Sequence, residues 1–290
     1  MIHIEIAERN YLLYLLLPHP AKIALLSPAS RERLDRINRG VNESLYSGQG
    51  ATAYDRTHRY AEEEQHEYPA RALIDRVWAP EGYGRVLELG AGTGYFTARL
   101  ARRARSVLAV EPVPDMQRVL RARCRAEHLG NVEVLGVSAF DLPERVPPAS
   151  VDSAVIIQSL HHVHRRPEVF EILRRAVRPG GRLYMVEPHH NVRRATRLLR
   201  TWLAQYRAPA FWRDEVNWAT HDFLTRGELR ALCRRGGFEV ATIGGYWIPY
   251  FRRLIRDPER RFALEHRLGR LPGLRHWAGV LSVEAVRRPR

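Results

Sequence analysis

The sequence predicts an α/β fold built on a doubly wound, mostly parallel sheet. Between Arg85 and Val192, short apolar runs typical of buried strands alternate with longer amphipathic stretches typical of helices. A turn with three glycines, Gly90–Gly94, joins the first of these strands to the first helix. Strands that alternate with helices imply parallel pairing through right-handed crossovers.

Seven strands are expected along the chain, with helices on both faces of the sheet. The apolar runs predict strands at 85–89, 106–111, 132–137, 151–158, 182–187, 238–243 and 279–286. The stretches between them predict helices at 97–104, 114–129 and 167–177. Gly130 is the expected cap of the second helix, and Arg-Pro-Gly-Gly closes the third.

The chain is expected to form one main domain with helical additions. Residues 1–80 predict a helical N-terminal region that covers the ligand site, and residues 81–290 predict the doubly wound domain. A helical lid insert is expected at about 192–222 and a second insert at about 245–278.

An apolar run near the N-terminus is too short to cross a membrane. It occupies Tyr11–Leu17 and ends at Pro18, whereas a span needs about 20 apolar residues. We expect a buried helix or a homodimer contact through the N-terminal helices. A helix that lies on a membrane surface is the alternative.

The composition is strongly basic, with a net charge of +15 over 290 residues, and Lys22 is the only lysine. The arginines are spread along the chain, so the charge bears on solubility and non-specific association, and no specific nucleic-acid partner is expected. Cys124 and Cys233 form neither a disulfide framework nor a metal motif. We therefore expect a cytoplasmic protein without a metal site.

The glycine-rich turn favours a nucleoside-like ligand. Gly90, Gly92 and Gly94 give G-x-G-x-G, whereas a dinucleotide fingerprint needs its third glycine at position 95, which is Tyr95. Glu111 ends the second strand, where a carboxylate can accept hydrogen bonds from ribose hydroxyls. The turn and this acid together predict that the ligand carries a ribose.

These stretches resemble the class I S-adenosylmethionine-dependent methyltransferases, especially the branch that acts on small molecules, quinones and lipids. The matching stretches are VLELGAGTGYFT, VLAVEPVPDM, VSAFDLP, SVDSAVIIQSLHHV and VFEILRRAVRPGGRLYMVEP. The resemblance implies a Rossmann-like sheet, S-adenosylmethionine as cofactor and S-adenosylhomocysteine as product. It also implies a small-molecule methyl acceptor.

The resemblance also implies which residues bind the cofactor. Glu88 and Gly90 correspond to the methionine end, Glu111 to the ribose, and Gln158 to the vicinity of the sulfonium. The remaining implied cofactor residues are Tyr54, Ala91, Gly92, Thr93, Gly94, Pro112, Met116, Ser138, Ala139 and Phe140. Ser138 departs from the family, which often has an aspartate there.

A general base is expected among the residues that follow the fourth and fifth strands. LHHVH places His161 and His162 after the fourth strand, and Glu187 ends the fifth. If the acceptor is a hydroxyl, one of these histidines with Glu187 is the predicted base. Packing or helix capping by the histidine pair is the alternative.

Two other function classes stay open: a nucleic-acid methyltransferase and a non-catalytic cofactor-binding protein of the same fold. The fourth strand ends in QSLHH, unlike enzymes that methylate base amino groups, and we find no appended RNA-binding module. The segment 193–218 interleaves arginines with aromatic residues. It predicts an amphipathic lid helix or a pocket for an anionic or aromatic substrate.

Overall fold

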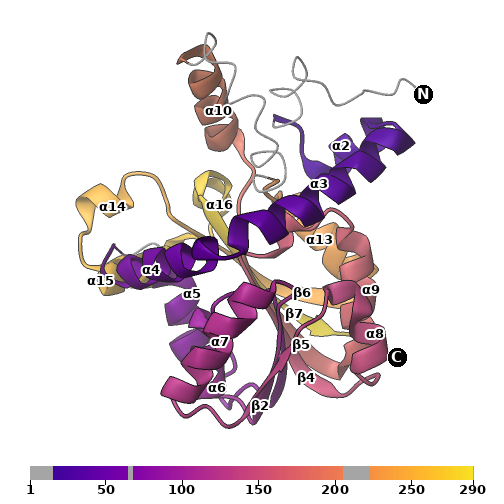
Figure 1. The fold of residues 1–290 in the computed structure, drawn as a ribbon. Helices are drawn as coiled ribbons and strands as arrows, with labels where there is room; N and C mark the ends of the chain where they lie inside the picture. The colour runs from indigo at the N-terminus through magenta and orange to yellow at the C-terminus, as the bar shows by residue number, and fades with distance from the viewer. Residues whose placement is uncertain (1–15, 65–67, 205–221, 290) are drawn as a thin grey trace.

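Seven strands form a single sheet in the order β3-β2-β1-β4-β5-β7-β6 (Figure 1). The structure is a computed structural model that describes residues 16–64, 68–204 and 222–289. The strands are β1 Arg85–Leu89, β2 Ser106–Val110, β3 Val132–Leu135, β4 Val151–Ile157, β5 Val177–Pro188, β6 Phe238–Tyr246 and β7 Val280–Arg287. All neighbours pair in parallel except β7, which is antiparallel to β5 and β6. The predicted seven-stranded, mostly parallel sheet is confirmed.

The central strands are buried on both faces, which explains their nearly continuous apolar sequences. In β1, Leu87 and Leu89 belong to one core cluster, and Val86 belongs to the cluster on the opposite face. Alternate side chains of a strand point to opposite faces, so a single run of apolar residues supplies both clusters.

Four helices cover the sheet of the central domain: α6 Tyr95–Ala101, α7 Pro114–Ala126, α9 Arg166–Ala176 and α13 Arg226–Arg235. The prediction that Gly130 caps the second helix is wrong. His128 takes the left-handed conformation (φ 54°), and the Leu129 N–H donates to the Cys124 carbonyl at 2.8 Å. This is the bond pattern of a Schellman cap, with histidine in the position that glycine usually fills.

The N-terminal region is helical. It contains α2 His19–Leu25, α3 Pro28–Tyr46, α4 Gln49–Glu64, α5 Tyr68–Ala72 and a π-helical turn, η2 Leu73–Val77. Ser27 caps α3 by accepting a hydrogen bond from the Ser30 N–H at 3.1 Å, and Pro28 fits the first helical position. Figure 1 shows α3 and α4 lying across one end of the sheet. Most of the apolar run 11–17 lies outside the described residues.

The remaining helices belong to the inserts and connections. They are η3 Ala139–Asp141, α8 Leu142–Arg145, η4 Leu160–His162, α10 Val192–Ala204, α14 Phe251–Leu254, α15 Pro258–Leu268 and α16 Pro272–Trp277. Within the described parts of the chain, every helix is too short or too polar to cross a bilayer.

Candidate functional site

A cavity of about 270 Å³ lies at the carboxyl ends of β1, β2 and β4, beneath α3. This is the edge at which doubly wound sheets bind their ligands. The residues on its sheet side are Leu89, Gly90, Gly92, Val110, Glu111, Pro112, Val113, Met116, Ser138, Ala139, Phe140, Ile156, Gln158 and Ser159. The cavity thus collects most of the cofactor residues that the family resemblance implied.

Two of the three glycines in the turn are required by packing. A Cβ atom at Gly90 would lie 2.4 Å from Ser159 Cβ, and one at Gly94 would lie 2.3 Å from Leu120 Cδ1. Both glycines also have positive φ, 73° and 85° respectively. The first strand therefore packs closely against the segment after β4, and the turn packs closely against α7.

Gly92 faces the cavity instead. A Cβ atom there would meet one atom within 4 Å, Tyr54 Cε1 at 3.8 Å. The Gly92 N–H donates to Glu111 Oε2 at 2.8 Å, and the Val113 N–H donates to Glu111 Oε1 at 2.9 Å. Each carboxylate oxygen keeps a second lone pair, so Glu111 can still accept hydrogen bonds from a ligand. Burial raises the pKa of Glu111, and the two N–H donors counteract that rise.

Ser138 caps a turn beside the cavity. Its hydroxyl accepts from the Phe140 N–H at 3.3 Å, while its own N–H donates to Asp141 Oδ2 at 3.1 Å. This reciprocal pair begins η3 and sets Ala139 and Phe140 against the cavity.

Gln158 is strained where β4 ends. It has φ 48°, although a side chain disfavours that region, and its N–H donates to the Val186 carbonyl at 2.8 Å. Strained residues of this kind gather at ligand sites. Gln158 lines the cavity.

His161 and Glu187 contact each other but do not line the cavity. His161 Nδ1 lies 2.9 Å from Glu187 Oε2, and both side chains are buried. His162 is the member of the predicted histidine pair that lines the cavity. Its ring lies 4.1 Å from that of His161, centroid to centroid. The structure thus divides the predicted group: His161 contacts Glu187, and His162 faces the cavity. Which histidine acts as a base stays a prediction.

Several other predicted cofactor residues also lie away from the cavity lining: Glu88, Ala91, Thr93 and Gly94. Glu88 is buried and accepts a hydrogen bond from the Thr97 hydroxyl at 2.6 Å. Burial raises the pKa of Glu88 to about 8, because this one hydrogen bond does not replace the water that it loses. Glu88 thus lies beneath the turn and contacts α6.

The roof of the cavity comes from the N-terminal helices, and sequence reasoning missed most of it. Tyr54 of α4 is the one roof residue that was predicted. One face of α3 supplies the others: Asp35, Asn38, Arg39, Asn42, Glu43 and Tyr46. Their spacing of three and four residues is the available signal, since such residues share a helix face. None of the described lid residues 192–204 lines the cavity.

Two residues of the cavity lining have buried polar atoms without hydrogen-bond partners among the described residues. They are Asn42 Oδ1 and both ring nitrogens of His164. The Asn42 amide also donates to the His162 carbonyl at 3.4 Å, which ties α3 to the segment after β4. Burial lowers the pKa of His164 to about 3, so its ring is neutral near pH 7. A polar ligand group could satisfy these atoms.

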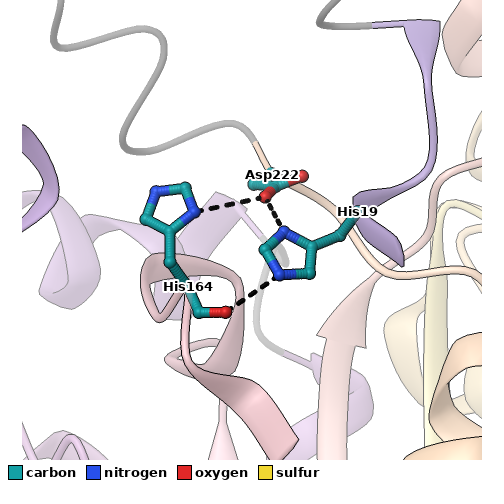
Figure 2. Close-up of side chains that lie close together, drawn as sticks. All are labelled: His19, His164 and Asp222. Atoms are coloured by element: carbon teal, nitrogen blue, oxygen red, sulfur yellow. Dashed lines mark hydrogen bonds and ion pairs between the residues drawn. The ribbon is translucent and has the colours of Figure 1, made fainter. Parts of the chain in front are cut away.

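His164 is one of three neighbouring residues that could bind a metal ion (Figure 2). Ligand atoms of His19, His164 and Asp222 lie within 4.8 Å of one another. His19 Nδ1 is 2.5 Å from Asp222 Oδ2, and Lys22 Nζ is 2.6 Å from Asp222 Oδ1.

Two buried cations already compensate the charge of Asp222. Arg166 Nη2 lies 3.5 Å from Asp222 Oδ2, in addition to the contact from Lys22. Burial opposes the ionisation of Asp222, but Lys22 and His19 outweigh it and hold the pKa of Asp222 well below its usual range. A divalent ion would add charge that nothing here compensates. The cluster is therefore better described as an ion-pair network than as a metal site.

The sheet order, the glycine turn and the position of Glu111 define a Rossmann-like domain with a ligand site at the carboxyl edge of its sheet. A family model described as "Methyltransferase domain" matches residues 87–185. Residues 87–185 are therefore similar to a methyltransferase domain, and S-adenosylmethionine is the cofactor that the resemblance of the sequence implies.

Curated relatives share this domain. An uncharacterized methyltransferase of Mycobacterium tuberculosis is 39% identical over 144 residues, which are 49% of this chain and 52% of that protein. A demethylmenaquinone methyltransferase of Tropheryma whipplei is 31% identical over 140 residues, 48% of this chain and 56% of the relative. A protein-L-isoaspartate O-methyltransferase of Nitrobacter winogradskyi is 54% identical over 63 residues, 20% and 27% of the two chains. The chain spans about half the length of the first two relatives and about a quarter of the third.

Solved structures agree with the fold. An S-adenosylmethionine-dependent methyltransferase from Mesorhizobium loti superposes with a TM-score of 0.51 at 20% identity, covering 76% of this chain and 97% of that one. This likeness shows the fold, whereas the acceptors in the relatives' names range from a quinone to a protein. The names of the relatives therefore do not define the acceptor class of this protein.

Proposed function

We propose that this protein transfers a methyl group from S-adenosylmethionine to a small-molecule acceptor. The observation that carries the proposal is that the glycine turn and Glu111 line the same cavity as Asn42 and His164. A nucleoside at Glu111 and a polar acceptor at Asn42 and His164 would therefore share one cavity.

The cofactor residues in this proposal are those that line the cavity. Glu111 accepts hydrogen bonds from the ribose hydroxyls, and Gly92 leaves room for the ligand. Met116 and Phe140 provide apolar contacts for the adenine, and Gln158 lies at the methionine end. The cofactor supplies a methyl group on a sulfonium, which is already a strong electrophile.

The chain's own contribution is then mainly to align the acceptor and exclude water. Asn42, His162 and His164 surround the acceptor in this proposal, and Tyr46 and Tyr54 close the roof. If the attacking group is a hydroxyl, His162 is the base, because it is the histidine of the pair that reaches the cavity. Its place beneath α3 favours a compact acceptor over a nucleic-acid strand.

Calorimetry with S-adenosylhomocysteine tests cofactor binding. The wild-type protein should bind it, and Gly92→Val should abolish binding because the new side chain enters the cavity. Gly180→Val is the matched control, since Gly180 is exposed, has positive φ (75°) as Gly92 does (55°), and has nothing within 4 Å of a Cβ atom. Equal binding by both variants would contradict the proposed cofactor site.

A second experiment tests the acceptor class. The protein and methyl-labelled S-adenosylmethionine are incubated separately with a small-molecule extract, with total RNA and with a protein fraction. We expect label in the small-molecule fraction alone, and Gly92→Val should remove it. Transfer to RNA or protein, or binding without any transfer, would support one of the other function classes.

A further inference from the structure

The amphipathic helix α10 exposes its apolar stripe to solvent. Val192, Leu199 and Leu203 are 54%, 43% and 61% exposed. Each residue of an α-helix advances about 100° around the axis, so these three side chains fall within about 40° of one another. Amphipathic helices of globular proteins normally bury such a stripe. Here it faces outward.

A row of arginines accompanies the stripe. Arg193, Arg197 and Arg200 are exposed and lie about 80–140° around the axis from Val192. Residues 192–204 contain four arginines and no acidic residue. A helix with an apolar stripe beside a cationic face is the arrangement that lies in the interface of an anionic bilayer.

The second insert exposes further apolar side chains close to the start of α10. Tyr250, Leu254, Leu271 and Trp277 are 71%, 77%, 51% and 47% exposed. Among the described residues, seven of the eight exposed large apolar side chains belong to these two inserts, and the eighth is Leu45. Tyrosine and tryptophan are favoured at the level of lipid headgroups.

Hydrogen bonds connect the two inserts. Arg193 Nη1 donates to the Trp247 carbonyl at 3.2 Å, and the Asn191 amide donates to the His276 carbonyl at 3.1 Å. Figure 1 shows α10 projecting from the molecule, with α16 near its base and α14 farther to the left on the same insert. The exposed apolar groups therefore come from adjoining parts of the fold.

The positive charge of α10 and of residues 245–278 favours an anionic partner. Residues 245–278 contain eight arginines against three acidic residues, in addition to the four arginines of α10. A basic surface with protruding apolar groups complements a bilayer with anionic headgroups, since the charges attract and the apolar groups insert. A second copy of the chain would bring the same positive charge to the contact and be repelled.

We propose that α10 and the α14–α16 insert form a docking surface for an anionic lipid bilayer. The surface holds the protein peripherally, without a span, and the chemistry in the cavity proceeds beside it. This inference is independent of the proposed function, because none of the exposed apolar residues on the two inserts lines the cavity.

Vesicle co-sedimentation tests this inference with the full chain. The wild-type protein should sediment with vesicles of phosphatidylglycerol and phosphatidylcholine but not with pure phosphatidylcholine, and added salt should weaken the binding. Leu199→Ser with Leu203→Ser should reduce the binding constant at least about tenfold. Arg197→Gln with Arg200→Gln should reduce it about ten- to thirtyfold, since each arginine near the surface contributes about fivefold or slightly less.

Matched controls separate the surface from general charge and stability. Leu45→Ser removes an exposed leucine of α3, and Arg125→Gln with Arg174→Gln removes two exposed arginines of α7 and α9. Both controls should keep vesicle binding within about twofold of that for the wild type, apart from the small loss of long-range attraction. Unchanged binding of S-adenosylhomocysteine by all variants would show that they fold.

Three outcomes would overturn the docking surface. The wild type could ignore anionic vesicles, or the control variants could lose as much binding as the α10 variants. Sedimentation velocity could instead reveal a dimer that the leucine variant dissociates, which would make this face a contact between copies. Preferential binding of RNA through the same arginines at physiological salt would also contradict the proposal.

Discussion

Glu187 holds His161 and the start of η4 together at the end of β5. Its Oε2 lies 2.9 Å from His161 Nδ1, and its Oε1 accepts the N–H groups of Ser159 and Leu160 at 2.9 and 2.8 Å. A single buried carboxylate thus orders the segment that carries His162 into the cavity. Glu187 therefore affects the site by positioning the segment that carries His162.

Glu187→Ala should therefore destabilise the fold by about 3 kcal/mol or more, because it leaves two buried backbone donors and a buried imidazole without their acceptor. Glu187→Gln should cost less, since its amide oxygen can still accept both N–H groups. Urea unfolding measures both values. Glu171→Ala, which removes an exposed partner of Arg235, should change stability by at most about 1 kcal/mol. Equal losses for Glu171→Ala and Glu187→Ala would contradict the role of the buried carboxylate.

The two adjacent histidines should differ in what their removal affects. On a hydroxyl acceptor identified by methyl transfer, His162→Ala should lower turnover by about 10²–10⁴-fold with little change in stability, the usual size for a general base. His161→Ala should mainly lower stability, because His161 contacts Glu187 and not the cavity. The measurements are kcat and the unfolding midpoint for each variant. If His162→Ala retains full turnover on such an acceptor, His162 is not the base.

The fold could be predicted from the sequence because its signals are local. The apolar run of β1, the glycine turn and Glu111 lie within 27 residues, and each follows from short-range spacing. The roof could not be predicted in this way. Asp35 and Asn42 look like the solvated face of a polar helix, and only the tertiary fold places that face over the cavity.

Long-range pairs were also beyond sequence reasoning. Lys22 and Asp222 are separated by 200 positions, and the sequence shows the two charges without showing that they meet. The orientations of the two adjacent histidines are a related case. The spacing placed both rings at the end of β4, but which one faces the cavity depends on the turn of η4 and on its hydrogen bonds to Glu187.

The pKa of Glu88 makes stability depend on pH. Its folded-state pKa is about 8, whereas an unfolded glutamate has a pKa of about 4.3. The native state therefore holds a proton that the unfolded state releases between these values. The contribution of Glu88 to stability is fully present below about pH 4 and is lost as the pH rises through about 8.

Glu88→Gln should remove this dependence. Near pH 5 the variant should match the wild type closely, and at pH 8 it should be more stable by a few kcal/mol at most, since the amide stays neutral. Urea midpoints at the two pH values measure the difference. Glu133→Gln, on the exposed part of β3, should show no such change between pH 5 and pH 8. If Glu88→Gln instead weakens S-adenosylhomocysteine binding strongly, Glu88 acts as an ionised ligand residue.

Removing the charge of Lys22 should lower the free energy of unfolding strongly. Lys22→Met leaves Asp222 buried with one fewer counter-charge, so it should cost about 3–5 kcal/mol, the usual result of removing one partner of a buried ion pair. Arg36→Met, in an exposed pair with Glu32 on α3, is the matched control and should cost at most about 1 kcal/mol. Urea unfolding measures both losses. Equal losses for the two variants would contradict the role of Lys22 in the buried ion pair.

Added Zn²⁺ tests whether the cluster is an ion-pair network or a metal site. A metal held by His19, His164 and Asp222 would raise the midpoint of urea unfolding of the wild type, as any ligand of the native state does. We expect no such rise, and a rise with zinc would contradict the description as an ion-pair network.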